Sequence, residues 1–270
     1  MDHFERSGLT FPVRDHGPAG ADTIVLLHGF PQDVSSYDDV VPTLISAGFR
    51  VLLPTQRGYA ASARPARRRD YRPRKLADDV IGLLDAAAVD RVHLVGHDWG
   101  GAVAWDVAGR YPERVRSATV LSTPHPRAFA ESMLRGNQAL RSWYMAFFQL
   151  PRLPELMLSS RLGKTLSDSG LPAEHVARYC APMADRAALT GAVNWYRGMM
   201  LSGVTPEVTV PTSYLWGAKD FALGRVAAER TALHVRGDYT FEALNAGHWL
   251  PETRPEHVAR AIIERARSAT

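Results

Sequence analysis

The sequence lacks the features of an oxidised or membrane-bound protein. Its 270 residues include a single cysteine, Cys180, so an internal disulfide is impossible. Because structural disulfides are rare in the cytosol, one free cysteine fits a reducing compartment, and we expect a cytoplasmic location. No segment approaches the roughly 20 apolar residues of a membrane-spanning helix. Residues 1–11 hold no apolar core of a signal peptide. We therefore expect no membrane partner.

Long runs of one charge sign are also absent, although the net charge is +4. The one dense basic run, Arg64–Lys75, contains Asp70, and we interpret it as a solvated surface loop. We therefore expect no nucleic-acid partner. The histidines and the cysteine lack the spacing of metal ligands, so we expect neither a metal nor an organic cofactor.

Short apolar segments alternate with segments of helical character. Nearly continuous apolar runs predict strands covered on both faces. They occupy Thr23–Gly29, Arg50–Pro54, Arg91–Gly96, Ser117–Ser122, Val208–Gly217 and Tyr239–Trp249. The expected helices occupy Ser36–Gly48, Lys75–Ala88, Gly100–Tyr111 and Pro255–Ser268. This alternation predicts an α/β fold with a mostly parallel sheet.

The alternation stops between residues 126 and 206. This segment is rich in Met, Leu and aromatic residues at helical spacing. We expect residues 1–125 and 207–270 to form one sheet domain, and residues 126–206 to form an inserted helical cap. Because no linker separates the pieces, the cap is expected to pack on the sheet domain as a lid.

A tight turn follows one of the predicted strands. Its sequence "GHDWG", from Gly96 to Gly100, matches the G-x-S-x-G nucleophile elbow with Asp98 in place of serine. Glycines are needed where the chain turns sharply from strand to helix, because a side chain would collide there. The motif predicts Asp98 as a nucleophile.

Three further elements accompany this elbow in chain order. In hydrolases with such an elbow, an oxyanion hole is formed by one amide of an upstream loop and by the amide after the nucleophile. Here these amides belong to Phe30 of "HGFP" and to Trp99. The order nucleophile, acid, histidine then predicts Asp220 of "WGAKD" and His248 of "AGHW" as partners of Asp98. We interpret His28, His93 and His97 as structural.

An aspartate nucleophile suits substitution at saturated carbon. Serine attacking such a carbon would leave an ether that water does not readily cleave, whereas a carboxylate leaves an ester that water can open. Asp98 is ionised at neutral pH and needs no base for the attack. His248, oriented by Asp220, is then needed to activate water in the second step. The expected substrate is an epoxide or an alkyl halide.

With these residues placed, the chain resembles the α/β-hydrolase-fold epoxide hydrolases of the soluble and bacterial types, relatives of the haloalkane dehalogenases. The resemblance extends over "HGFP", "TQRGYAAS", "GHDWGG", "WYMAFFQLP", "NWYR", "WGAKD" and "GHW". It implies a cap, a cis bond between Phe30 and Pro31, and two cap tyrosines that donate to the epoxide oxygen. Tyr144 and Tyr196 occupy the matching positions.

The cap also suggests which substrate the site accepts. Aromatic residues in and near it predict an apolar pocket that takes an alkyl or aryl epoxide, with water as second reactant. The candidate pocket residues are Trp143, Phe148, Trp195 and Trp249. We expect a monomer or a homodimer.

Two other functions are compatible with the same elbow. A haloalkane dehalogenase would use indole donors for the halide, and Trp99 with Trp143 or Trp195 keeps that possibility open. A non-catalytic receptor on the same fold would have no need to keep Asp98, Asp220 and His248 together.

Overall fold

A computed structural model describes residues 1–201 and 203–269 of the chain. Within them, eight strands form one sheet in the order β1-β2-β4-β3-β5-β6-β7-β8. Six strands from β3 to β8 are parallel, whereas β1 and β2 are antiparallel. The strands are β1 His3–Arg6, β2 Leu9–His16, β3 Thr23–Leu27, β4 Arg50–Pro54, β5 Val92–His97, β6 Val115–Leu121, β7 Thr212–Gly217 and β8 Tyr239–Leu244. The parallel sheet confirms the fold class that the apolar runs predict.

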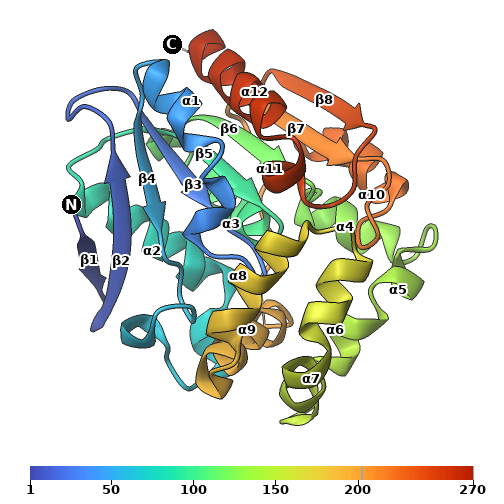
Figure 1. Cartoon of the computed structure of the whole chain (residues 1–270). Helices are drawn as coiled ribbons and strands as arrows, with labels where there is room; N and C mark the ends of the chain where they lie inside the picture. The colour runs from blue at the N-terminus through green and yellow to red at the C-terminus, as the bar shows by residue number, and fades with distance from the viewer. Residues whose placement is uncertain (202, 270) are drawn as a thin grey trace.

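The two antiparallel strands were not predicted from the sequence. In β2 the buried positions Phe11 and Val13 alternate with exposed ones, and Pro12 lies between them. Both strands lie at one side of the sheet (Figure 1). A strand buried on one face needs no continuous apolar run, so the criterion that found the central strands overlooks it.

Helices cover both faces of the sheet. Helices α1 (Val41–Ser46) and α12 (Pro255–Ser268) bury Leu44 and Ile262 in one core. Helices α2 (Pro73–Ala86) and α3 (Trp99–Arg110) bury Leu83 and Val103 in the other. Short elements complete the domain: α10 Arg225–Arg230, α11 Leu250–Thr253, and the 3-10 turns η1 Val34–Tyr37, η2 Ala61–Ala63, η3 Arg68–Tyr71, η4 Pro112–Arg114 and η5 Thr231–His234. The first expected helix thus begins late, after a 3-10 turn.

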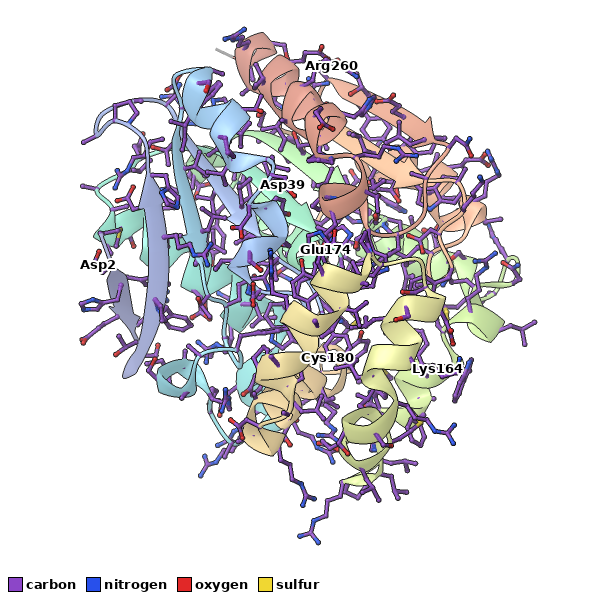
Figure 2. All side chains as sticks on the ribbon, viewed as in Figure 1. Asp2, Asp39, Lys164, Glu174, Cys180 and Arg260 are labelled. Atoms are coloured by element: carbon purple, nitrogen blue, oxygen red, sulfur yellow. The ribbon has the colours of Figure 1, made fainter. Side chains whose placement is uncertain are left out.

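Among the described residues between β6 and β7 there are six helices. They are α4 Pro126–Ser132, α5 Gln138–Arg141, α6 Trp143–Phe147, α7 Leu153–Asp168, α8 Ala173–Met183 and α9 Arg186–Met199. Lys164 on α7 and Glu174 on α8 lie on the solvent-facing side, and Cys180 is half-buried on α8 (Figure 2). A buried ion pair of 2.7 Å joins Arg197 to Glu155 and so ties α9 to α7. We keep 126–206 as the proposed bounds of the cap.

The basic run at residues 64–75 is more than a surface loop. Arg67, Arg68 and Arg69 are exposed as expected, but η3 and the start of α2 lie within the run. Tyr71 is fully buried. A Cβ on Gly198 of α9 would lie 2.3 Å from the Tyr71 carbonyl oxygen, so the backbones touch there. The run therefore supports the cap, which an exposed loop would not do.

Candidate active site

Asp98 lies on the sharp turn between β5 and α3. Its φ of 51° and ψ of −121° are unusual for a residue with a side chain. A Cβ on Gly96 would lie 2.2 Å from the Gly100 carbonyl oxygen, and one on Gly100 would lie 2.2 Å from that of Leu27. Both glycines are therefore required sterically, and the strained turn exposes the carboxylate at the end of the sheet.

The loop after β3 approaches this carboxylate. The Phe30 N–H donates to Asp98 Oδ1 at 2.7 Å, and a Cβ on Gly29 would lie 2.4 Å from the Asp98 Cβ. The bond between Phe30 and Pro31 is cis, as the resemblance implies. Trp99 begins α3 directly after Asp98. Of the two amides expected to form the oxyanion hole, the Phe30 amide donates a hydrogen bond to the Asp98 carboxylate.

The structure brings the expected acid and base to Asp98. His248 Nδ1 lies 2.8 Å from Asp220 Oδ2, and His248 Nε2 lies 3.6 Å from Asp98 Oδ2. The other Asp220 oxygen accepts hydrogen bonds from the N–H groups of Ala222 and Leu223 at 2.8 and 3.0 Å. Because Asp220 is buried and held by these amides, it fixes the orientation of the His248 ring.

Two carboxylates control the charge of His248. Burial opposes the charged imidazole, but Asp220 and then Asp98 favour it and raise the pKa of His248 to about 10. Burial also opposes ionisation of Asp98. The neighbouring His248 and the Phe30 N–H outweigh that effect and hold the pKa of Asp98 below its usual value. At neutral pH the site therefore holds an anionic carboxylate beside an imidazolium.

The free energy of unfolding is expected to depend on this imidazolium. The folded pKa of about 10 exceeds the ordinary value of 6.5. The stabilisation is therefore complete below pH 6.5 and is lost as the pH rises through about 10. Asp98→Asn removes one of the two anionic partners, so the pKa of His248 should fall. Imidazole NMR titration of both proteins measures the change, and equal pKa values would contradict this electrostatic coupling.

Two cap tyrosines face the same region as Asp98. Tyr144 lies on α6 and Tyr196 on α9, with ring centroids 6.0 Å apart. Tyr196 packs edge-on against Phe30 and Trp99, at centroid distances of 5.3 and 4.7 Å. Burial raises the pKa of both phenols, and the Asp98 charge raises them further. Both hydroxyls therefore stay protonated and are able to donate hydrogen bonds.

Asp98, Tyr144 and Tyr196 line one cavity of about 830 Å³. This volume is typical of a small-molecule site. Most other lining side chains are apolar, among them Leu76, Val103, Phe129, Met133, Met145, Met199 and Leu223. The walls therefore favour an apolar ligand whose reactive group reaches the carboxylate.

The four expected pocket residues do not share one location. Trp143 and Trp195 line the cavity, although Trp143 is 63% exposed. Phe148 is outside the lining and packs on Tyr196 with centroids 4.8 Å apart. Trp249 is also outside the lining and packs edge-on against His248 at 4.9 Å. Phe148 and Trp249 thus pack behind Tyr196 and His248, and their rings fill the adjacent core.

Residues 22–162, just over half of the chain, match the sequence model of a family described as alpha/beta hydrolase fold. The chain belongs to this α/β-hydrolase fold family. AB hydrolase superfamily protein YfhM of Bacillus subtilis is 35% identical, and the alignment covers 96% of this chain and 94% of that protein. Epoxide hydrolase 3 of Xenopus tropicalis is 34% identical, over 95% of this chain and 74% of its own length.

Solved structures of α/β hydrolases have the same arrangement. The crystal structure of epoxide hydrolase A from Mycobacterium thermoresistibile superimposes with a TM-score of 0.84 at 30% sequence identity. The match covers 98% of this chain and 97% of that chain. The likeness therefore includes the cap helices as well as the sheet.

Three buried residues beside the triad of this α/β hydrolase were not found from the sequence. They are Gln32, Tyr179 and Glu252, and the first two donate hydrogen bonds to Glu252. Burial raises the pKa of Glu252 to about 7. Gln32 directly follows "HGFP", which was the only available signal. Tyr179 and Glu252 belong to no motif, and only the packing of the cap brings Tyr179 to Glu252.

No metal centre or membrane helix accompanies the site in residues 1–201 and 203–269. These residues contain no cluster of three or more His, Cys, Asp or Glu side chains able to hold a metal ion. Their helices include none with both the length and the apolar character needed to cross a bilayer.

Proposed function

We propose that this α/β hydrolase converts an apolar epoxide into a vicinal diol through a covalent ester on Asp98. The observation that carries the proposal is one cavity lined by a nucleophilic carboxylate and two phenols. Relatives over nearly the whole chain, named epoxide hydrolase 3 and epoxide hydrolase A, support the same reaction class. Apolar walls favour an alkyl or aryl epoxide.

In the first step, an Asp98 oxygen attacks an epoxide carbon. A carbon–oxygen bond forms to the carboxylate, and the bond from that carbon to the epoxide oxygen breaks. The alkoxide is a poor leaving group, so it needs a hydrogen-bond donor and then a proton. Tyr144 and Tyr196 are buried and protonated, and they supply the hydrogen bonds.

In the second step, water adds to the carbonyl carbon of the ester. Alkylation has removed the charge of Asp98, so one of the two carboxylates that favoured the imidazolium is gone. The pKa of His248 then falls, so the imidazolium gives up its proton to the alkoxide, which becomes a hydroxyl. The neutral ring is then able to take a proton from the attacking water. The Phe30 N–H, already 2.7 Å from Asp98 Oδ1, stabilises the tetrahedral oxyanion. As the tetrahedral intermediate collapses, the bond to the ester oxygen of the substrate breaks and that oxygen takes the proton from His248, which releases the diol. The Asp98 carboxyl group then returns its proton to His248 and is a carboxylate again.

The contacts of Trp195 favour an epoxide over an alkyl halide. A halide leaves without a proton but requires N–H donors around it. The Trp195 indole N–H already donates to the Arg57 carbonyl oxygen at 2.7 Å. The side chain of Phe30 offers no polar donor. The phenols of Tyr144 and Tyr196 match the needs of an alkoxide better.

Isotope labelling tests the covalent mechanism. In one turnover in H₂¹⁸O, Asp98 is expected to gain a single heavy oxygen, because water attacks its carbonyl carbon. The diol of that turnover should remain unlabelled, since its new oxygen comes from Asp98. Mass spectrometry of the peptide containing Asp98 and of the diol measures both. Labelled diol with unlabelled Asp98 would instead show direct attack by water.

A further inference from the structure

A buried hydrogen-bond chain begins in the cap and ends at the catalytic residues. The Tyr179 hydroxyl of α8 donates to Glu252 Oε1 at 2.8 Å, and Gln32 Nε2 donates to the same oxygen at 2.5 Å. Tyr179 and Gln32 have no exposed surface, and Glu252 is 8% exposed. Glu252 thus joins a cap helix to the loop after β3.

The Gln32 amide carries this connection to two catalytic segments. Its oxygen accepts a hydrogen bond from the Gly29 N–H at 2.9 Å and lies 2.8 Å from His97 Nδ1. Because its nitrogen is held by Glu252, the direction of the amide is fixed. Gly29 precedes the amide that donates to Asp98, and His97 precedes Asp98 itself.

The His97 ring also contacts the backbone of the base. Burial lowers the pKa of His97 to about 4, so the neutral ring donates from only one of its two nitrogens and packs against the other partner. His97 Nε2 lies 2.9 Å from the His248 carbonyl oxygen, which also accepts a hydrogen bond from the Ser122 hydroxyl at 2.7 Å. A second cap contact lies next to it, since the Trp249 indole N–H donates to the Ser169 hydroxyl at 2.9 Å. The segment carrying His248 is therefore held from the cap at two points.

We propose that Glu252 and Tyr179 are positioning residues for hydrolysis of the alkyl-enzyme ester. Through Gln32 and His97 they keep the Phe30 amide and the His248 ring at the positions and orientations, relative to the Asp98 carbonyl group, that ester hydrolysis requires. This inference rests on the proposed epoxide hydrolysis and assigns to the cap a role in its second half.

Ester formation and ester hydrolysis depend to different degrees on how the Phe30 amide and the His248 ring are positioned. Attack by Asp98 needs an ionised carboxylate and the two phenols, none of which is directly bonded to the chain. Ester hydrolysis needs the Phe30 amide aimed at the oxyanion and His248 aimed at the attacking water. A shift of about 1 Å in such groups costs on the order of 100-fold in rate. Removing hydrogen bonds from this network should therefore slow ester hydrolysis and leave the rate of ester formation nearly unchanged.

Quenched-flow mass spectrometry with styrene oxide, as an aryl probe, measures ester formation and decay separately. Glu252→Leu is expected to slow decay by about 10-fold to 100-fold, while formation stays within about twofold. Tyr179→Phe loses one hydrogen bond and should slow decay less. Glu252→Gln keeps the oxygen that accepts from Tyr179 and Gln32, so it should recover most of the decay rate.

Tyr111→Phe is the matched control, because the Tyr111 hydroxyl donates to the Asp78 carboxylate at 2.6 Å and neither residue lines the cavity. The inference is overturned if formation and decay slow together, if neither changes, or if Glu252→Gln is as slow as Glu252→Leu. If Glu252→Leu does not fold, the rate of ester decay in Tyr179→Phe is compared with that in Tyr111→Phe. Equal decay rates would then overturn the inference. If the wild-type protein forms neither ester nor diol across alkyl and aryl epoxides, the proposed function itself fails.

Discussion

His248→Gln is expected to trap the alkyl ester on Asp98. The variant keeps the nucleophile and both phenols, but no base remains to activate water. General base catalysis contributes about 10²-fold to 10⁴-fold, so kcat should fall by that factor while the first attack proceeds. Intact-protein mass spectrometry should then show a stoichiometric increase equal to the mass of the epoxide.

The charge of Asp98 decides the conditions for that experiment. In the wild-type site, His248 helps to hold the pKa of Asp98 below its usual value, whereas burial acts in the opposite direction. Without the imidazolium, burial dominates and the pKa of Asp98 should rise. The pH below which adduct formation slows should therefore be higher in this variant than the pH below which ester formation slows in the wild-type protein, because the carboxylate must be ionised to attack.

A matched histidine variant controls for the loss of a buried ring. His93 is buried and lies 2.9 Å from the Ser117 hydroxyl, away from the carboxylate. His93→Gln should turn over epoxide without accumulating an adduct. Normal diol release by His248→Gln, with no adduct on Asp98, would remove His248 from the mechanism.

Replacing both cap tyrosines should block the first step instead. Tyr144→Phe with Tyr196→Phe keeps the aromatic packing but removes both donors to the alkoxide. Loss of such donors costs about 10²-fold or more, so kcat/KM should fall by at least that factor and no adduct should accumulate. Each single variant should lose less, since one phenol remains in the cavity.

Tyr71 provides the control for the tyrosine variants. It also lines the cavity, but its hydroxyl donates to the Pro65 carbonyl oxygen at 2.8 Å. Tyr71→Phe should therefore leave the rate of ester formation within a few-fold of the wild type. Combining the double variant with His248→Gln isolates the attack, because adduct formation is then the only step measured. Unchanged adduct formation would mean that the phenols do not assist ring opening.

Because the ester forms in one step and is hydrolysed in the next, the variants are expected to differ in how much ester accumulates. Loss of His248 should leave an ester that does not decay, whereas loss of both phenols should prevent it from forming. Changes in Glu252 or Tyr179 should slow decay only in part. The three groups of variants therefore differ in the amount of adduct and not only in the rate of diol release.

The sequence by itself determined the six parallel strands of the sheet and the order of Asp98, Asp220 and His248 at their ends. The elbow is local, because Gly96 and Gly100 are the residues that allow Asp98 to adopt its φ of 51°. The parallel strands can be predicted from their continuous apolar runs, because helices cover both faces of the sheet. Residues at the carboxyl ends of such strands meet at one edge of the sheet, so Asp98, Asp220 and His248 were predictable together.

Only the tertiary structure decided how the cap meets that edge. The sequence predicts Phe148 and Trp249 as pocket residues, whereas in the structure they pack behind Tyr196 and His248 and lie outside the cavity lining. Tyr179, Glu252 and Gln32 come from three segments far apart in the sequence, and the hydrogen bond from Tyr179 to Glu252 exists only once α8 has docked. The physical reason is that the direction of a side chain depends on how its helix is rotated and packed against distant elements. A short stretch of sequence does not determine either of these.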